Sequence, residues 1–376
     1  MAKVADRAVG RSPGLQIGRV SGVPVYLGRT WPVIVLVILV TFGPVVQRAR
    51  PDLGLLAFGV ALAYALLLLV SVLVHEAAHA LVGIARGYAV ARIVADLWGG
   101  HTAYDSTDSS PGDSALVAVA GPLANVALAV AGWAVEPLVP PGVPSLLMTA
   151  FVWTNGFVAL FNLLPGLPLD GGFLVDALVW RITGSREKGM VAAGWCGRVV
   201  AALVVLWFLG RPLLSGGRPD MYDVIWAVVI GGFLWVGASQ AIRGGRARLL
   251  LSSIPVGSVW QPASTIPVHA TVDDLAGLLQ SGRAGVLVVV MSADGTPLGT
   301  VDPEAVRAIP AERHATVPVT AVLRSRPPGW VVDAGPGDPI TEVVRVMQEL
   351  GVREVPVRDP RGVIDKAVRV TDLGGS

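Results

Sequence analysis

The sequence is short of two kinds of residue that many folds depend on, cysteine and charged side chains. It contains one cysteine, Cys196, which excludes an intrachain disulfide and a metal site built from several thiolates. Only 15% of the residues are charged while 53% are hydrophobic, a balance typical of a membrane protein. The formal net charge of +2 is too small to indicate a nucleic-acid partner. We therefore expect a membrane protein that does not bind nucleic acid.

Long uncharged runs recur along the first two thirds of the chain. Residues 53–74 carry no charge, and about 20 apolar residues are enough for a helix to cross a bilayer. The same pattern predicts six membrane-spanning helices, at 31–47, 53–83, 115–135, 146–164, 191–209 and 224–242. The first apolar run begins only near residue 31, without a small-residue cleavage site, so we expect this helix to be retained rather than removed as a signal peptide.

The second of these helices contains three ionisable residues, His75, Glu76 and His79. Ionisable side chains at membrane depth are costly and by default indicate a functional site. The two histidines are four residues apart, so on a helix they share one face and can bind one zinc ion. Glu76 beside them can accept a proton from a zinc-bound water. This H-E-x-x-H pattern predicts a zinc hydrolase, and the alternative is a chance match with two histidines packed in a core.

The fourth predicted helix breaks at residues 162–172, NLLPGLPLDGG, because the prolines and glycines there cannot continue a regular helix. Asp170 lies in this break, where an unwound backbone leaves its carboxylate free to face a metal. Two histidines and one carboxylate, with water in the fourth position, make a catalytic zinc site. The alternative for Asp170 is an N-cap of a short helix over 172–180.

Two shorter segments have strand-like patterns. Residues 14–28 predict a β-hairpin at the membrane surface, and residues 88–104 a membrane-associated hairpin or re-entrant segment. An exposed edge of the second hairpin can pair with an unfolded substrate, or the hairpin only shields the site. His101 within it is either a third metal ligand or a polar turn residue. Asn125, in the third helix, either contacts a substrate or an oxyanion or makes an interhelical hydrogen bond.

Lysine and arginine fall on one side of the predicted six-helix arrangement. They occur in the N-terminal segment and in the loops 181–188 and 243–248, which share a side if the chain crosses six times. The positive-inside rule makes that side the cytoplasm, so we expect a multi-pass cell-membrane protein with both termini in the cytoplasm. The second and fourth predicted helices then both run toward the cytoplasm, which places His75, His79 and Asp170 at a similar depth.

From residue 249 the composition becomes that of a soluble domain. Residues 268–306 predict the order strand, helix, strand, turn, strand and helix, and residues 331–373 repeat it. Each unit leaves an apolar face uncovered, so the two should stack. We therefore predict a polytopic α-helical membrane domain over 1–248 and a soluble α+β domain over 249–376, the latter with repeats at about 252–313 and 314–376.

The motifs HEAAH at 75–79 and NLLPGLPLDGG at 162–172, in this order on apolar segments, resemble the site-2 protease family of intramembrane metalloproteases. Within it, the chain is similar to the bacterial branch that carries a cytoplasmic pair of cystathionine-β-synthase-type (CBS) repeats, and the resemblance covers nearly the whole chain. It implies one Zn²⁺ held by His75, His79 and Asp170.

The resemblance also implies roles for residues outside this group. Glu76 is implied to be the general base. Asn162, which begins the second motif, is implied to lie near the site and handle substrate, and Asn125 occupies the position of a family asparagine in the third helix. The segment 88–104 looks like the family's membrane-associated sheet.

The implied substrates are single-pass membrane proteins, cut within or beside the bilayer in regulated intramembrane proteolysis. Such substrates include inhibitors that hold sigma factors and other membrane-tethered regulators, often shortened first by another protease. The alternative function is a CBS-gated transporter or channel. That alternative accounts for six helices and a soluble pair of repeats, but not for HEAAH together with an aspartate in a helix break.

The CBS half departs from the pattern that binds adenine nucleotides, Gly-x-x-Thr/Ser-x-x-Asp. In the first repeat Asp302 replaces the hydroxyl residue and Ala305 the acid, and a carboxylate there would repel a phosphate. In the second repeat Thr371 and Asp372 are adjacent rather than spaced. These departures weigh against nucleotide binding, and a homodimer through the CBS pair or substrate gating are the roles left open.

Overall fold

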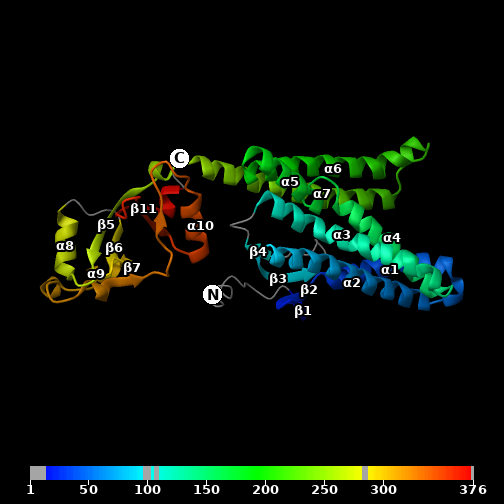
Figure 1. Cartoon of the computed structure of the whole chain (residues 1–376), viewed down its shortest axis with the longest axis horizontal. Coiled ribbons are helices and arrows are strands. Elements are labelled where there is room, and N and C mark those ends of the chain that lie inside the picture. The colour runs from blue at the N-terminus through cyan, green and yellow to red at the C-terminus, as the bar shows by residue number, and fades with distance from the viewer. Residues whose placement is uncertain (1–13, 96–102, 106–109, 282–286, 374–376) are drawn as a thin grey trace. The chain divides into compact units, whose positions relative to one another are not determined.

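The computed structural model describes residues 14–95, 103–105, 110–281 and 287–373. The chain divides into two compact units, Met1–Arg246 and Ala247–Ser376. The first unit is mainly helical and the second is rich in β-strands (Figure 1). His101 lies outside the described residues, so the two alternatives for it stay predictions.

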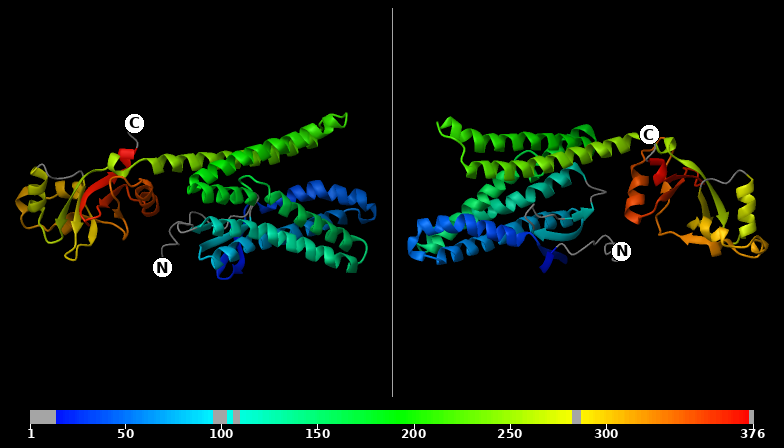
Figure 2. Two further views of the ribbon diagram at one scale, coloured as in Figure 1. Left: turned by 45° about the horizontal axis from the view of Figure 1, so that its top comes forward. Right: turned by 180° about the vertical axis from the view of Figure 1, so that it is seen from behind.

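Six helices in the described residues are long and apolar enough to cross a membrane, as predicted. They are α1 (Trp31–Ala49), α2 (Leu56–Ala85), α3 (Pro111–Val135), α4 (Val143–Asn162), α6 (Arg186–Leu214) and α7 (Met221–Ser253). A shorter helix, α5 (Asp170–Thr183), follows the break after α4. Figure 2 shows α6 and α7 running alongside each other.

Several helices are longer than their apolar runs. Helix α3 starts at Pro111 because the Ser110 hydroxyl accepts a hydrogen bond from the Asp113 amide at 3.1 Å. Helix α6 starts at Arg186 because Ser185 caps it in the same way, through the Lys188 amide at 3.3 Å. Hydropathy marks the part of a helix that suits lipid, whereas capping groups decide where the helix begins.

The two predicted hairpins form one four-stranded sheet in the order β1-β2-β3-β4. Its strands are β1 (Gly14–Val20), β2 (Val23–Gly28), β3 (Ala89–Ala95) and β4 (Ala103–Asp105). Strands β1–β2 and β3–β4 pair antiparallel, and β2–β3 pair parallel. Buried side chains of the sheet, including Val25 and Ile93, pack on Ala80 of α2. The sheet therefore lies against the end of α2 that carries the histidines (Figure 1).

The C-terminal unit contains the predicted repeat. The first copy is β5 (Gln261–Pro267), α8 (Val272–Gln280), β6 (Leu287–Met291), β7 (Pro297–Val301) and α9 (Pro303–Arg307). The second is β9 (Val332–Asp333), α10 (Thr341–Leu350), β10 (Glu354–Arg358), β11 (Ile364–Arg369) and a short 3-10 helix, with β8 (Leu323–Ser325) between the copies. In each copy a parallel strand pair flanks the helix and an antiparallel strand follows.

One seven-stranded sheet joins the two repeats, in the order β8-β7-β6-β5-β11-β10-β9. The joint is the antiparallel pair β5–β11, which brings the first strand of one copy beside the last of the other. A shared core lies there, with Trp330 packed among residues of both copies such as Val289 and Ile364. The stacking of the two repeats is therefore confirmed, and its cause is burial of apolar faces that neither copy covers alone.

Candidate metal centre

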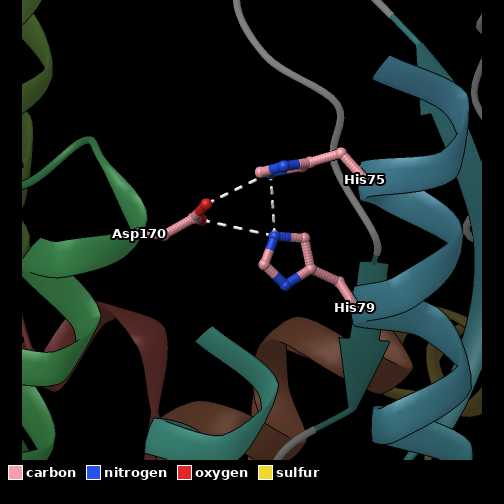
Figure 3. A group of neighbouring side chains, drawn as sticks. All are labelled: His75, His79 and Asp170. Atoms are coloured by element: carbon pink, nitrogen blue, oxygen red, sulfur yellow. Dashed lines mark hydrogen bonds and ion pairs between the residues drawn. The ribbon is translucent and has the colours of Figure 1, made fainter. Parts of the chain in front are cut away.

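Three predicted residues from two helices meet at one point. His75 and His79 project from one face of α2, and Asp170 projects from the start of α5 toward both of them (Figure 3). The two imidazole Nε2 atoms lie 3.1 Å apart. Asp170 Oδ2 lies 3.1 Å from Nε2 of His75, and Oδ1 lies 3.4 Å from Nε2 of His79. Both histidines are buried, and the Asp170 side chain is 17% exposed.

Asp170 is the first residue of α5, whereas the sequence predicted it within the unwound break or as an N-cap. The N-cap position belongs to Leu169, so the N-cap alternative for Asp170 is wrong, and the helix begins two residues before the predicted start at 172. The reason is that the helix resumes as soon as Pro168 has been passed. Asp170 is therefore fixed by the first turn of a helix rather than by a free loop.

The loop that leads to Asp170 packs against glycines of α6 and α7. The Leu167 amide donates to the Ala193 carbonyl of α6 at 3.1 Å. A side chain at Gly197 of α6 would overlap the Leu167 carbonyl oxygen, and one at Gly237 of α7 would overlap the Pro168 ring. These close approaches need glycine, and they set how far the loop reaches toward α2.

In each histidine, the oxygen that accepts a hydrogen bond from Nδ1 determines the tautomer of the ring. Nδ1–H of His79 donates to the Val117 carbonyl of α3 at 2.7 Å, and a carbonyl can only accept. Nε2 of a neutral His79 therefore carries a lone pair, which faces His75 and Asp170.

The corresponding assignment for His75 comes from a chain of buried amides. Asn155 of α4 donates from Nδ2 to the Phe151 carbonyl at 2.9 Å and to the Ser71 hydroxyl at 3.0 Å, so its Oδ1 faces Asn125. Asn125 must then donate from Nδ2 to that oxygen, at 2.8 Å, and present its own Oδ1 to His75 at 2.5 Å. His75 therefore carries its proton on Nδ1 and has its lone pair on Nε2.

Two imidazole lone pairs and a carboxylate thus converge with no donor among them. Asp170 Oδ2 is buried and has no hydrogen-bond partner. Gly121 of α3 keeps the space open, because a methyl group there would overlap Nε2 of His79 and lie 2.6 Å from Nε2 of His75. Acceptors this close repel one another unless a cation lies between them, and two histidines with one carboxylate fit zinc.

The other predicted site residues lie around this group. Glu76 follows His75 on α2 and is 5% exposed. Asn125 is fully buried, and its amide joins His75 to Asn155 across helices, which is the interhelical hydrogen bond of the two alternatives given for it. Asn162 is the last residue of α4, is half-buried, and is not brought into the His–His–Asp group.

Sequence reasoning missed Asn155, Ser71 and the function of Gly121. Asn155 is a lone amide in an apolar span, which is the signal that could have identified it. Its link to Asn125 could not be predicted, since the packing of α3 against α4 is a tertiary feature.

Comparisons with known proteins identify the family of the chain. The profile of peptidase family M50 matches residues 63–140 and 141–207. The zinc metalloprotease Rip3 of Mycobacterium tuberculosis is 31% identical over 77% of this chain and 73% of its own length. A protein of Synechocystis named as a zinc metalloprotease is 27% identical over 93% of this chain and 92% of its own.

Two solved structures resemble parts of this chain. The site-2 protease of Methanocaldococcus jannaschii aligns with 61% of this chain and 95% of its own, at 23% identity and a TM-score of 0.44. A CBS-domain protein of Thermoplasma acidophilum aligns with 32% of this chain and 67% of its own, at 21% identity and a TM-score of 0.24. With Rip3 as a relative and the M50 profile spanning both motifs, this chain belongs to peptidase family M50, the site-2 protease family of zinc metalloproteases.

Proposed function

We propose that the protein is an intramembrane endopeptidase that cuts single-pass membrane proteins, with one zinc ion per chain held by His75, His79 and Asp170. The observation that carries the proposal is the convergence of three acceptor groups, without a donor, on helices of membrane-spanning length. Buried acceptors that face one another would be strongly destabilising without a cation. Their retention in a costly environment therefore indicates function.

Zinc bound there supplies Lewis-acid chemistry, polarising a carbonyl oxygen and lowering the pKa of a water molecule. The residues of the chain supply the rest. Glu76, next to a ligand on α2, accepts the proton of the attacking water and returns it to the leaving amine. The partly accessible Asp170 carboxylate indicates that the site is not sealed from water.

Asn125, Asn155 and Ser71 act in this proposal as positioning residues. Their hydrogen bonds begin at backbone carbonyls of α2 and α4 and end at Nδ1 of His75. Outer partners of this kind set the tautomer and the ring orientation of a ligating histidine. Asn125 therefore serves the substrate through His75 and not by direct contact.

The substrate is bound in extended form. Strand β4 ends one edge of the sheet that packs on α2, and a free strand edge can pair with an unwound peptide. The Asn162 side chain, which makes no hydrogen bond within the described residues, is available for such a peptide. An unwound substrate also exposes its backbone carbonyl, which a helical substrate does not.

We place the protein in the cell membrane with both termini in the cytoplasm, because the basic loops share that side. The CBS pair then regulates cleavage by dimerisation or substrate gating. Asp302 accepts from the Glu304 amide at 3.0 Å and pairs with Arg324 at 3.0 Å, and Asp372 accepts from the Arg369 amide at 3.0 Å. Because hydrogen bonds and an ion pair within the C-terminal unit already engage these carboxylates, they support a role other than adenine-nucleotide binding.

The test is a comparison of membrane proteomes from cells that carry the wild type or Glu76→Gln. We expect a single-pass membrane protein to accumulate uncut in the variant, and its cleavage to return with the wild type. Glu76→Gln should keep its zinc, because the base is not a ligand. If the variant cleaves that protein at the wild-type rate when co-expressed, the assignment of Glu76 is wrong.

A further inference from the structure

Arg198 is a charged residue in the interior of α6. It is the only charged side chain between residues 190 and 210 of α6, and residues 224–242 of α7 contain none. It lies twelve residues after the start of the helix, about 18 Å along the axis. A charge so deep in an apolar span needs a partner.

The guanidinium of Arg198 is held between two tryptophan rings. Its Cζ lies 4.8 Å from the ring centroid of Trp195 on α6 and 4.9 Å from that of Trp235 on α7. One terminal nitrogen donates to the Ser239 hydroxyl of α7 at 3.1 Å. Its Nε is buried and has no acceptor. Five N–H donors thus make one hydrogen bond within the described residues, although the rings fix the plane of the group.

The other two arginines of α6 each lie near a carboxylate, whereas Arg198 lies near none among the described residues. Arg211, toward the opposite end of the helix, lies 3.8 Å from the Asp223 carboxylate. Arg186, at the first residue, lies 4.0 Å from the Asp176 carboxylate. No carboxylate lies within ion-pair distance of Arg198 in the part of the chain that the structure describes. Its counter-charge must therefore come from outside these residues.

The surroundings of Arg198 suit a lipid. The Trp195 and Trp235 side chains are 47% and 49% exposed on helices that span the membrane, so half of each ring faces lipid. Arg198 covers Trp195, three residues nearer the start of α6, so its head is directed toward the basic end of the helix. An arginine below the interface can extend its head toward the headgroups, and tryptophan rings also favour that region.

We propose that Arg198, Trp195, Trp235 and Ser239 bind the phosphate of a membrane phospholipid. The planar guanidinium donates two parallel hydrogen bonds to the phosphate oxygens, and the Ser239 hydroxyl can donate a third. The exposed faces of the two tryptophans contact the glycerol and upper acyl chain. The lipid supplies the negative charge that the described residues do not.

The lipid site adjoins the backbone that carries Asp170. Gly197, next to Arg198, is the residue on which the Leu167 carbonyl rests, and Leu167 precedes Asp170 by three positions. A lipid that holds α6 to α7 at this level would therefore hold the loop as well.

The test is native mass spectrometry of the full chain in detergent, titrated with phosphatidylglycerol or with diacylglycerol of the same tails. We expect Arg198→Gln to bind phosphatidylglycerol about tenfold more weakly than the wild type, which corresponds to about 1.4 kcal/mol. Diacylglycerol, which lacks the phosphate, should bind both proteins equally. Arg211→Gln is the matched control on the same helix and should bind phosphatidylglycerol like the wild type.

Three results would overturn the proposal. If Arg198→Gln binds phosphatidylglycerol as tightly as the wild type does, Arg198 does not take part in the site. If Arg198→Gln loses as much affinity for diacylglycerol as for phosphatidylglycerol, the site recognises only the apolar part of the lipid. Displacement of phosphatidylglycerol from the wild type by millimolar inorganic phosphate would assign the site to a soluble anion. If Arg198→Gln does not fold, thermal unfolding of the wild type decides: phosphatidylglycerol should raise the midpoint more than diacylglycerol, and equal shifts contradict the site.

Discussion

His75 and Asn125 are joined by a hydrogen bond of 2.5 Å between Nδ1 of the imidazole and the amide oxygen, and this bond determines which ring nitrogen faces Asp170. The amide is oriented from behind by Asn155, which is itself fixed by the Phe151 carbonyl. The tautomer of one residue on α2 thus depends on an amide of α4.

Removing the distal amide should loosen metal binding without touching a ligand. We expect Asn155→Leu to weaken zinc binding about 10- to 100-fold, the usual effect of losing an outer partner of a ligand. Competition with a chelator of known affinity measures this. The control is Thr154→Val, which removes the 2.6 Å hydrogen bond between Thr154 and Tyr64 but has no link to His75. Equal zinc affinity in the two variants would show that the amide chain is only structural.

Asp170 should be essential for holding the metal, while Glu76 should not. We expect about one zinc per chain in the purified wild type and in Glu76→Gln, and a loss of zinc in Asp170→Ala, because two histidines alone leave the site without a charged ligand. Elemental analysis of protein purified without chelator gives the ratio. Full zinc content in Asp170→Ala would contradict the ligand set and would revive the transporter alternative.

A methyl group at Gly121 should exclude the metal by volume. Gly121→Ala places Cβ in overlap with Nε2 of His79, so either the ring turns away or α3 moves. We expect loss of zinc with little change in helix content by circular dichroism. Gly112→Ala, on the same helix but in ordinary contact distance of Ser110, is the control and should keep its zinc.

The Asp170 loop should be sensitive to α6. Gly197→Ala would overlap the Leu167 carbonyl, and overpacking of this kind typically costs about 1–3 kcal/mol. We expect a lower thermal midpoint, weaker zinc binding and slower cleavage together. Gly210→Ala on the same helix meets no atom within 4 Å and should leave all three unchanged. A stable Gly197→Ala protein with wild-type zinc affinity would show that α6 does not set the position of Asp170.

One carboxylate of the C-terminal unit should give a pH-dependent stability. Asp274 accepts from the backbone amide and the hydroxyl of Thr271 in a capping box at the start of α8, and these bonds lower the pKa of Asp274. A folded pKa below the unfolded value stabilises the protein above the unfolded pKa, near 3.9 for aspartate, and the effect is lost as pH falls through the folded value. Asp274→Asn should therefore lower the denaturation midpoint at pH 7 and match the wild type near pH 2.

The sequence by itself determined the elements with strong periodic or chemical signals. Six long apolar runs with few charges specified six spans, because a helix satisfies all of its backbone hydrogen bonds within one segment in lipid. The spacing of His75 and His79 placed both rings on one face, since helical geometry alone determines it. The repeat order of the C-terminal unit followed from alternation and turn residues.

Only the tertiary structure decided what joins these elements. The parallel pairing of β2 with β3 links segments on either side of two helices, and no local pattern encodes it. How closely neighbouring helices approach also decided three features of the site. They are the hydrogen bonds through Asn155, the contact of Leu167 with Gly197, and the space beside Gly121. Close packing in a membrane is a matter of shape between helices, whereas hydropathy and spacing describe one helix at a time.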